Sequence, residues 1–303
     1  MEDTVYYRQA KLFLRILPVI ARYPIFALKG GTAINFFIRD LPRLSVDIDL
    51  TYTPVDDRET ALAAISDALG VIEKDIERLV RPAAVMRKAI EGKVMGLVIR
   101  ADGALVKIEP NPVLRGTIYE PQALSVTPRV QDEFAMSVKT RVLAMEDLYG
   151  GKICAALDRQ HPRDPFDVKL LFENEGITDS IRKSFIVHLI SHDRPMSELL
   201  DPTFQDLKEI YENEFKGMTF VKTSLEELEA ARTNLVRKIR ENLTSGERWF
   251  ILSVKHGEPQ WELLGLDGID LLPAVKWKLL NISRMGRTKH ESAIRKLEKC
   301  LTS

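Results

Sequence analysis

The feature that most constrains this chain is a diglycine turn, Gly30-Gly31, followed after a short interval by Asp47-Ile48-Asp49. The apolar run before the glycines predicts a buried strand, and the alternating residues around the aspartates predict a second strand. Side chains alternate between the two faces of a strand, so both carboxylates point the same way, with Cα atoms about 7 Å apart. Two like charges on one face are unfavourable unless a cation lies between them.

This pattern points to a phosphate site beside a metal site. Gly30 and Gly31 let the backbone approach a ligand closely, and a helix beginning near Thr32 would direct its N–H groups at a phosphate. Mg²⁺ prefers oxygen ligands and keeps substrate phosphates in its shell. A phosphate site ahead of Asp47 and Asp49, holding the metal that activates the attacking hydroxyl, is the arrangement that nucleotidyl transfer needs. The alternative is an ordinary strand with acidic residues on its solvated face.

Composition bounds the class of protein. The chain has 303 residues, 45% of them hydrophobic, which is enough for two modest domains or one large one. Acidic and basic residues balance at 44 each, so the chain is not a globally basic nucleic-acid binder. From Lys276 to Ser303, however, eight bases face two acids. This segment is a candidate for contact with a polyanion such as RNA, and a solvated helix face is the alternative.

Cysteine usage and the N-terminus indicate the cellular setting. Only Cys154 and Cys300 are present, without a Cys/His cluster, which argues against a disulfide framework or a zinc site. No basic segment precedes an apolar stretch after Met1, and no apolar run approaches 18 residues. We therefore expect a cytoplasmic protein with no membrane partner.

The texture of the chain changes near residue 145. Before it, strand and helix patterns mix; they include an amphipathic helix from Asp57 to Leu79 and a hairpin of strands Lys93–Arg100 and Ala104–Glu109. After it, the pattern is helical over 146–158, 165–174, 179–192, 204–214 and 224–242. We predict an α/β lobe with a mixed sheet over residues 1–145 and a mostly helical lobe over 146–303 that completes the active-site cleft.

Glu109 is a candidate third carboxylate. It ends a strand that we expect beside the strand of the aspartates, where transferases use a further acid to orient or deprotonate the incoming hydroxyl. A solvated acid at a strand end is the alternative.

A basic and acidic cluster follows residue 150. Lys152 and Arg159 lie seven residues apart, near one face of a helix, and Arg163 comes shortly after. Lys152 is predicted to neutralise phosphate charge in the transition state, and the two arginines to bind phosphate oxygens bidentately. The alternative is helix capping, with Asp164 as N-cap, Pro165 as first helical residue and an acid in the first turn.

Four aromatic residues lie in the last quarter of the chain. Their apolar neighbours favour a role in the core or in a contact between subdomains, and stacking on a nucleobase is the alternative. They are Trp249, Phe250, Trp261 and Trp277.

Together these motifs resemble the AbiEii/AbiGii family of nucleotidyltransferase toxins, the toxin half of bacterial type IV toxin–antitoxin pairs, which are also linked to abortive phage infection. The resemblance spans roughly residues 25–280. The matching segments are 28–35 (LKGGTAIN), 45–50 (SVDIDL), 146–148 (EDL) with Lys152, 163–167 (RDPFD) and 272–279 (LPAVKWKL).

The resemblance implies a nucleotidyltransferase-fold N-terminal lobe and a helical C-terminal lobe. It implies that Asp47 and Asp49 bind metal, that Lys152 handles the phosphates of an NTP, and that Asp167 is a further essential acid that orients Lys152 or contacts substrate. Ser45 matches a serine that some antitoxins phosphorylate, which would place negative charge beside the metal site; other antitoxins of the family are transcriptional repressors.

The resemblance also implies an acceptor. Some members add nucleotides to the 3′ end of tRNA, which blocks aminoacylation and hence translation, so we expect NTP, a tRNA 3′ end and a cognate antitoxin as partners. A protein or small-molecule hydroxyl is the alternative acceptor, and a non-catalytic binding protein that keeps the fold is a further alternative.

Overall fold

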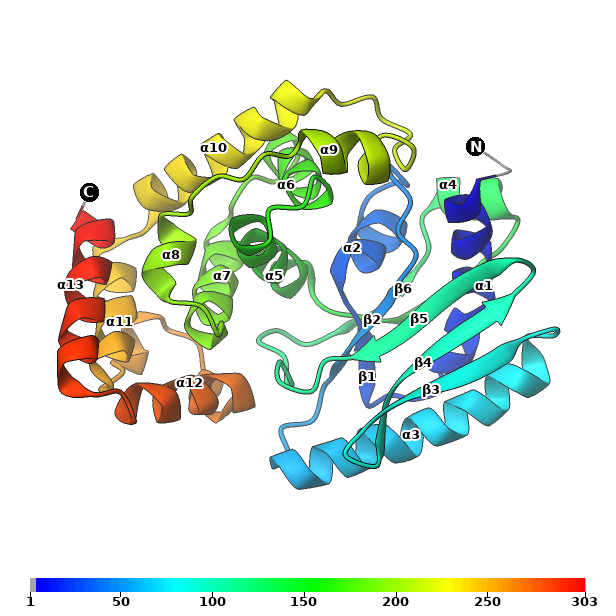
Figure 1. The fold of residues 1–303 in the computed structure, drawn as a ribbon, viewed down its shortest axis with the longest axis horizontal. Helices are drawn as coiled ribbons and strands as arrows, with labels where there is room; N and C mark the ends of the chain where they lie inside the picture. The colour runs from blue at the N-terminus through cyan, green and yellow to red at the C-terminus, as the bar shows by residue number, and fades with distance from the viewer. Residues whose placement is uncertain (1–3, 303) are drawn as a thin grey trace. The chain divides into compact units, whose positions relative to one another are not determined.

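The computed structural model describes residues 4–302, and the chain divides into two compact units (Figure 1). Unit 1 comprises Met1–Leu148 together with the short segment Met218–Lys222. Unit 2 comprises Tyr149–Gly217 and Thr223–Ser303. The return of Met218–Lys222 to unit 1 has no counterpart in the sequence pattern.

Unit 1 is built on a mixed seven-stranded sheet with the strand order β3-β4-β5-β2-β1-β7-β6. The pairs β1–β7 and β2–β5 are parallel, and the other neighbours are antiparallel. The α/β class with a mixed sheet is thereby confirmed. The strands are β1 Phe26–Leu28, β2 Ile48–Tyr52, β3 Ala84–Ile90, β4 Lys93–Ala101, β5 Ala104–Pro110, β6 Gln122–Ser125 and β7 Lys139–Val142.

Two long helices, α1 (Val5–Ile20) and α3 (Arg58–Leu79), cover the sheet. α1 packs on β5, α3 packs on β4, and the two helices contact each other, so they share one face. The Asp57 side chain caps α3 by accepting from the N–H groups of Glu59 and Thr60, which stabilises a helix by about 1 kcal/mol. The spacing predicted an apolar stripe of five residues on α3. Ile65, Leu69, Ile72 and Ile76 are fully buried, and Leu62 is half-buried.

The remaining helices of unit 1 are short. They are α2 Gly30–Ala33, which continues as the π-helix η1 Ile34–Ile38, and α4 Pro128–Phe134.

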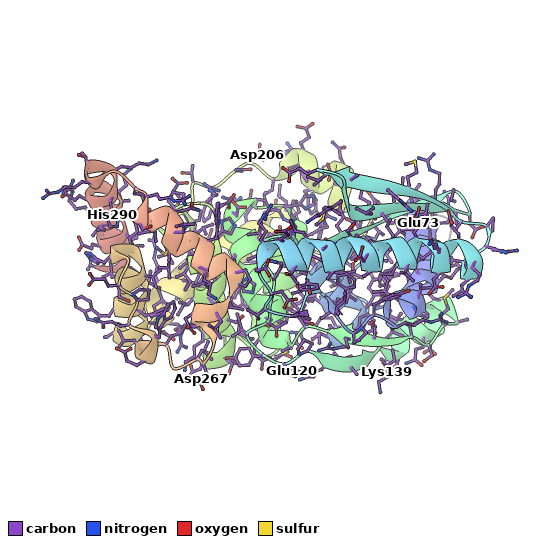
Figure 2. The ribbon with its side chains drawn as sticks, turned by 90° about the horizontal axis from the view of Figure 1, so that it is seen from below. Glu73, Glu120, Lys139, Asp206, Asp267 and His290 are labelled. Carbon is purple, nitrogen blue, oxygen red and sulfur yellow. The ribbon has the colours of Figure 1, made fainter. Side chains whose placement is uncertain are left out.

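The predicted hairpin of β4 and β5 is confirmed, and β3 extends it by one strand that the sequence did not predict. Nearly all side chains of β3 are exposed, so the strand lacks the apolar alternation that reveals a half-buried strand. Arg87 of β3 donates to Glu73 of α3 at 2.7 Å, and Figure 2 labels Glu73 on that helix.

The segment Met218–Lys222 holds the loop that precedes the two aspartates. The Leu44 N–H donates to the Met218 carbonyl at 2.7 Å, and the Phe220 N–H donates to the Pro42 carbonyl at 2.8 Å. Arg43 and Thr219 form an antiparallel bridge between these contacts. The backbone that leads into β2 is therefore held by this segment at Pro42, Arg43 and Leu44.

Unit 2 is helical, which confirms the predicted character of the C-terminal region. Its helices are α5 Met145–Asp158 (which begins in unit 1), α6 Arg163–Glu173, α7 Asp179–Ser191, α8 Met196–Leu200, α9 Lys208–Ile210 with the π-helix η2 Tyr211–Phe215, α10 Leu225–Asn242, α11 Ser245–His256, α12 Pro273–Ser283 and α13 Arg287–Thr302, with 3-10 turns η3 Trp261–Leu263 and η4 Ile269–Leu271.

The aromatic residues of unit 2 separate into two groups. Phe250 is fully buried and packs against Trp261, with ring centroids 5.8 Å apart. Trp249 and Trp277 are 65% and 55% exposed, so the expected core role is wrong for both. They lie on the outward faces of α11 and α12, whose apolar neighbours occupy the inward faces.

No helix among residues 4–302 is both long enough and apolar enough to cross a membrane.

Candidate active site

The diglycine turn brings the backbone against an aspartate. Gly30 has a φ of +75° and begins α2, two residues before the predicted helix start. A methyl group built on Gly30 would lie 2.8 Å from Asp49 Oδ2, closer than a side chain tolerates. Only glycine fits here, because the position demands both a left-handed conformation and a bare Cα. The N–H groups of this first turn have no intrahelical acceptors.

The second glycine makes room for a buried arginine that sequence reasoning missed. Arg43 is 1% exposed, and its Nη2 lies 2.5 Å from the place where a Gly31 methyl would stand. Its Nη1 donates to the Leu44 carbonyl at 3.0 Å. The apolar neighbours of Arg43 in the sequence were a weak sign of this burial.

Thr32 and Ser45 join the turn to the aspartate segment. Thr32 Oγ1 donates to the Asp47 carbonyl at 2.7 Å and hydrogen-bonds to Ser45 Oγ at 2.9 Å. Both side chains are buried. Three of the predicted nucleotide-binding positions, Gly31, Thr32 and Ser45, therefore lie together.

The two aspartates keep the predicted alternation. Strand β2 begins at Ile48, so Asp49 lies in the strand and Asp47 lies in the extended segment just before it. Asp47 and Asp49 are half-buried, whereas Val46, Ile48 and Leu50 are buried. The carboxylates thus lie on the opposite side from the apolar core.

Glu109 lies directly beside Asp49. β5 runs parallel to β2, and the register places Glu109 opposite Asp49. The predicted neighbourhood of the two strands is confirmed. Lys88 of β3 donates to Glu109 Oε1 at 2.5 Å, so the glutamate already has one cationic partner.

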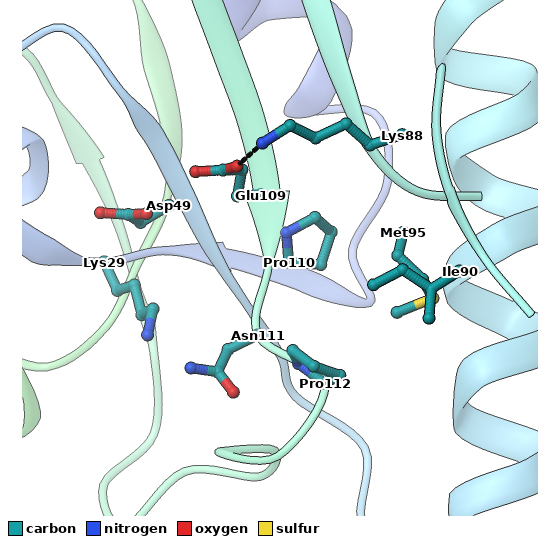
Figure 3. A pocket seen from close by; sticks show the side chains of 9 residues that line it. All are labelled: Lys29, Asp49, Lys88, Ile90, Met95, Glu109, Pro110, Asn111 and Pro112. Atoms are coloured by element: carbon teal, nitrogen blue, oxygen red, sulfur yellow. Dashed lines mark hydrogen bonds and ion pairs between the residues drawn. The ribbon is translucent and has the colours of Figure 1, made fainter. Parts of the chain in front are cut away.

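These acids line an open pocket of about 320 Å³ in unit 1. Figure 3 shows Asp49 and Glu109 side by side, with Lys88 bonded to Glu109. The walls are otherwise mixed: Lys29 and Asn111 are polar, and Ile90, Met95, Pro110 and Pro112 are apolar. Asp47 does not line this pocket.

The donor set suits magnesium. Among residues 4–302, no group of three or more His, Cys, Asp or Glu side chains is arranged to hold a metal ion. Mg²⁺ does not need such a group, because one or two carboxylates, waters and substrate phosphates usually complete its shell. The half-buried oxygens of Asp47 and Asp49 are donors of this kind.

In unit 2, Lys152 lies in a largely buried cluster of ion pairs. Its side chain is 5% exposed, and its Nζ lies 2.9 Å from Asp164 Oδ1 and 2.8 Å from Asp167 Oδ2. Both aspartates are fully buried. Arg159 adds a bidentate contact to Asp164, at 2.8 and 2.9 Å, from a side chain that is 57% exposed.

The capping interpretation of Asp164 is wrong. Helix α6 begins at Arg163 after Pro162, so Asp164 lies inside the first turn with its side chain turned to Lys152 and Arg159. Burial alone would raise the pKa of Asp164, but the charges and hydrogen bonds of Lys152 and Arg159 outweigh it and hold that pKa well below its usual range. The carboxylate is therefore ionised at neutral pH.

Arg163 is held by a histidine. Its Nε donates to His161 Nδ1 at 3.3 Å, so the neutral ring carries its proton on Nε2 and donates to Glu214 Oε2 at 3.2 Å. Burial, together with the Arg163 charge, lowers the pKa of His161 against the opposing effect of Glu214.

Comparisons with known proteins identify the family and the fold. A family model described as "Nucleotidyl transferase AbiEii toxin, Type IV TA system" matches residues 12–252. The solved structure of MenT4, a nucleotidyltransferase toxin from Mycobacterium tuberculosis H37Rv, aligns with a TM-score of 0.59 and 12% sequence identity. The alignment covers 97% of this chain and 93% of that one; at this identity it shows a shared fold. No curated protein matches the sequence.

Proposed function

Because this chain belongs to the AbiEii family of nucleotidyltransferase toxins, we propose that it transfers a nucleoside monophosphate from an NTP to the 3′ end of an RNA, with tRNA as the acceptor. The observation that carries this proposal is the register of Asp49 and Glu109 on adjacent parallel strands, beside the bare Cα of Gly30. The backbone that would bind the phosphates and the carboxylates that would act on them then lie within unit 1.

The phosphates of the NTP are the groups that the turn is proposed to bind. Gly30, Gly31 and Thr32 offer first-turn N–H groups to the triphosphate, and Ser45 lies against Thr32. Asp47 and Asp49 would hold Mg²⁺, which when bound neutralises the developing charge on the phosphates. Arg43 fixes the turn from beneath Gly31.

The chemical step is a substitution at phosphorus. The acceptor hydroxyl oxygen forms a bond to the α-phosphorus, the bond from the α-phosphorus to the oxygen that bridges it to the β-phosphate breaks, and pyrophosphate leaves with that electron pair. Glu109 accepts the hydroxyl proton, and Lys88 orients its carboxylate.

The basic residues of unit 2 are proposed to serve the phosphates. Arg159 is the most exposed of them, and Asp164 holds its guanidinium by two hydrogen bonds. From the sequence and the family resemblance, Lys152 and Arg163 are proposed for the same role, with Asp167 keeping Lys152 in place.

An exposed stripe of α12 supports a nucleic-acid acceptor. Trp277 is flanked by Lys276 and followed by Leu280 and Arg284 at three- and seven-residue steps, which helical geometry places on one face. A large exposed aromatic ring between cations suits stacking on a base beside a phosphate. The stripe lies in the basic C-terminal segment.

The physiological proposal follows from the acceptor. Modification of the tRNA 3′ end prevents aminoacylation and so stops translation in the cytoplasm, and a cognate antitoxin restrains the enzyme, in a system that serves abortive infection. Phosphorylation of Ser45 is one proposed form of restraint, because it would put negative charge against the phosphate turn.

The test incubates purified protein with each labelled NTP, Mg²⁺ and total tRNA. We expect label on RNA with at least one NTP and loss of labelling when a chelator removes the metal. Label on protein and none on RNA would replace the acceptor by a protein hydroxyl. Absence of any labelled product, from protein shown to be folded, would reject the transferase proposal.

A further inference from the structure

Asn111 stands at the open end of the pocket, next to the carboxylates. Its N–H donates to the Leu50 carbonyl at 2.9 Å, which extends the β2–β5 pairing by one residue beyond Pro110. Side chains two residues apart on a strand point the same way, so Asn111 faces the same side as Glu109. Both line the pocket.

The orientation of the Asn111 amide is fixed by its own hydrogen bonds. Oδ1 accepts from the backbone N–H groups of Val113 and Leu114 at 2.9 and 2.8 Å. Because both partners are donors, the oxygen must face them and the NH₂ group must face away. Figure 3 shows the amide nitrogen turned to the side of Lys29 and the oxygen turned to the chain beyond Pro112. Asn111 thus offers only donors to a ligand.

Part of the pocket wall near this donor is apolar. Pro110, Pro112, Met95 and Ile90 line the same pocket, and Ile90 is largely exposed although it is hydrophobic. Proline rings and a thioether pack well against the face of an aromatic ring. An apolar wall with one fixed donor, beside carboxylates that act on phosphate and hydroxyl, is complementary to a nucleobase joined to its ribose.

Resting on the proposed transferase function, we propose that this pocket binds a nucleoside and that Asn111 Nδ2 donates to an acceptor atom of its base, which makes Asn111 a specificity-determining residue. The nucleoside belongs either to the incoming NTP or to the last nucleotide of the RNA acceptor. Both have the same chemistry, and the experiment separates them.

The test compares wild type with Asn111→Ser and Asn111→Asp. Each replacement keeps an oxygen for the backbone N–H groups of Val113 and Leu114 and removes the NH₂ donor. Serine is neutral and aspartate is charged, so an effect common to both comes from the lost donor. Asn174→Asp, at an exposed amide in unit 2, is the control for added charge elsewhere.

Two preferences are measured for each protein: kcat/KM for the four NTPs, and kcat/KM for four short RNAs that differ only in the last base. Loss of one base contact should change the ratio between the best and worst bases by at least about fivefold. A change confined to the NTP ratio assigns the pocket to the incoming nucleotide, and a change confined to the RNA ratio assigns it to the acceptor. Both ratios staying within about twofold of wild type overturns the inference while leaving the transferase proposal intact.

Calorimetry with the same four NTPs and four RNAs tests the inference if the protein binds nucleotides but does not transfer them. If wild type shows no transfer, the proposed function fails, yet a base preference in binding that both Asn111 variants lose still supports the pocket. Equal binding of all bases by wild type and variants overturns it.

Discussion

The acidic residues of the two units have the same chemistry and opposite surroundings. In unit 1, Asp49 and Glu109 line an open pocket. In unit 2, Asp164 and Asp167 are fully buried around Lys152. A carboxylate that lines an open pocket can exchange water for a metal or a substrate, whereas a buried one depends on the cation that compensates it. The sequence alone predicts catalytic roles for Asp49, Glu109 and Asp167 and offers helix capping for Asp164. The difference in burial predicts that substitutions in the two groups will have different effects.

The largest expected effect is on catalysis in unit 1. Asp49→Asn removes one metal-binding charge and should lower nucleotide transfer at least about 100-fold. The melting temperature should change little, because the side chain keeps its shape. Asp67→Asn, at an exposed position of α3, is the matched control. Transfer by Asp49→Asn at more than half the wild-type rate would remove Asp49 from the chemistry.

The next effect is on the stability of unit 2. The sequence alone predicts that Lys152→Ala abolishes transfer and leaves the fold intact. Burial of the cluster adds an expected loss of stability. The substitution leaves two buried aspartates short of a cation and should cost about 3–5 kcal/mol of unfolding free energy. Urea denaturation measures this, with Lys299→Ala at an exposed position as control.

A double variant sharpens the same test. Lys152→Met with Asp167→Leu leaves Asp164 with Arg159 and should recover part of the lost stability, because no uncompensated charge remains. If Lys152→Ala unfolds at the wild-type urea concentration, the cluster does not stabilise the fold.

Gly30→Ala combines strain with displacement of a carboxylate. Gly30 and Gly103 both have positive φ, +75° and +71°, but only a methyl on Gly30 meets Asp49. Both alanine variants should lose about 1–2 kcal/mol of stability from the left-handed backbone. Gly30→Ala alone should also lose about 100-fold in transfer, as a misplaced reacting group does. Equal activity of the two variants would contradict the close approach of Asp49.

The pH dependence of stability reports on Asp164. Its pKa is held below the usual range in the folded state, so the unfolded state takes up the proton first as pH falls. Its contribution is complete above the unfolded pKa, about 3.9, and is lost below it by up to about 1.4 kcal/mol per pH unit. Urea titrations of wild type and Asp164→Asn should therefore give a constant difference above about pH 5 that shrinks in more acidic buffer. A difference that grows there would contradict the assignment.

The smallest effect concerns the acceptor. Trp277→Ala should raise the KM for RNA about fivefold to tenfold through lost stacking and leave the KM for NTP unchanged. Trp249→Ala is the matched control, because that tryptophan is also largely exposed but lies on another helix. Equal effects of the two variants would contradict a specific role of the α12 stripe in RNA binding.

Local patterns predicted most of unit 1. The amphipathic α3, the β4–β5 hairpin and the alternation around Asp49 follow from short-range periodicity, which one sequence displays in full. Strand β3 was missed because its side chains are exposed and carry no alternation. Arg43 was missed because its burial depends on the space above Gly31, a tertiary fact.

The site was harder to predict where partners lie far along the chain. The position of Glu109 beside Asp49 was predictable from the expected strand order, but the contact of Lys88 with Glu109 depends on β3. Capping of the helix was an alternative for Asp164 because capping is a local rule. Its side chain instead pairs with Lys152 in the preceding helix and with Arg159 just after that helix. The exposure of Trp277 was equally out of reach, since apolar neighbours in sequence turned to the other face of α12.

The bridge between Thr219 and Arg43 sets an order of events during synthesis. A nascent chain leaving the ribosome can assemble the sheet early, but the strand entrance that carries Ser45 lacks its last hydrogen-bonded neighbour until Lys222 has emerged. Fragments that stop at Leu148 lack that neighbour as well. Premature termination between Leu148 and Met218 therefore leaves unit 1 incomplete.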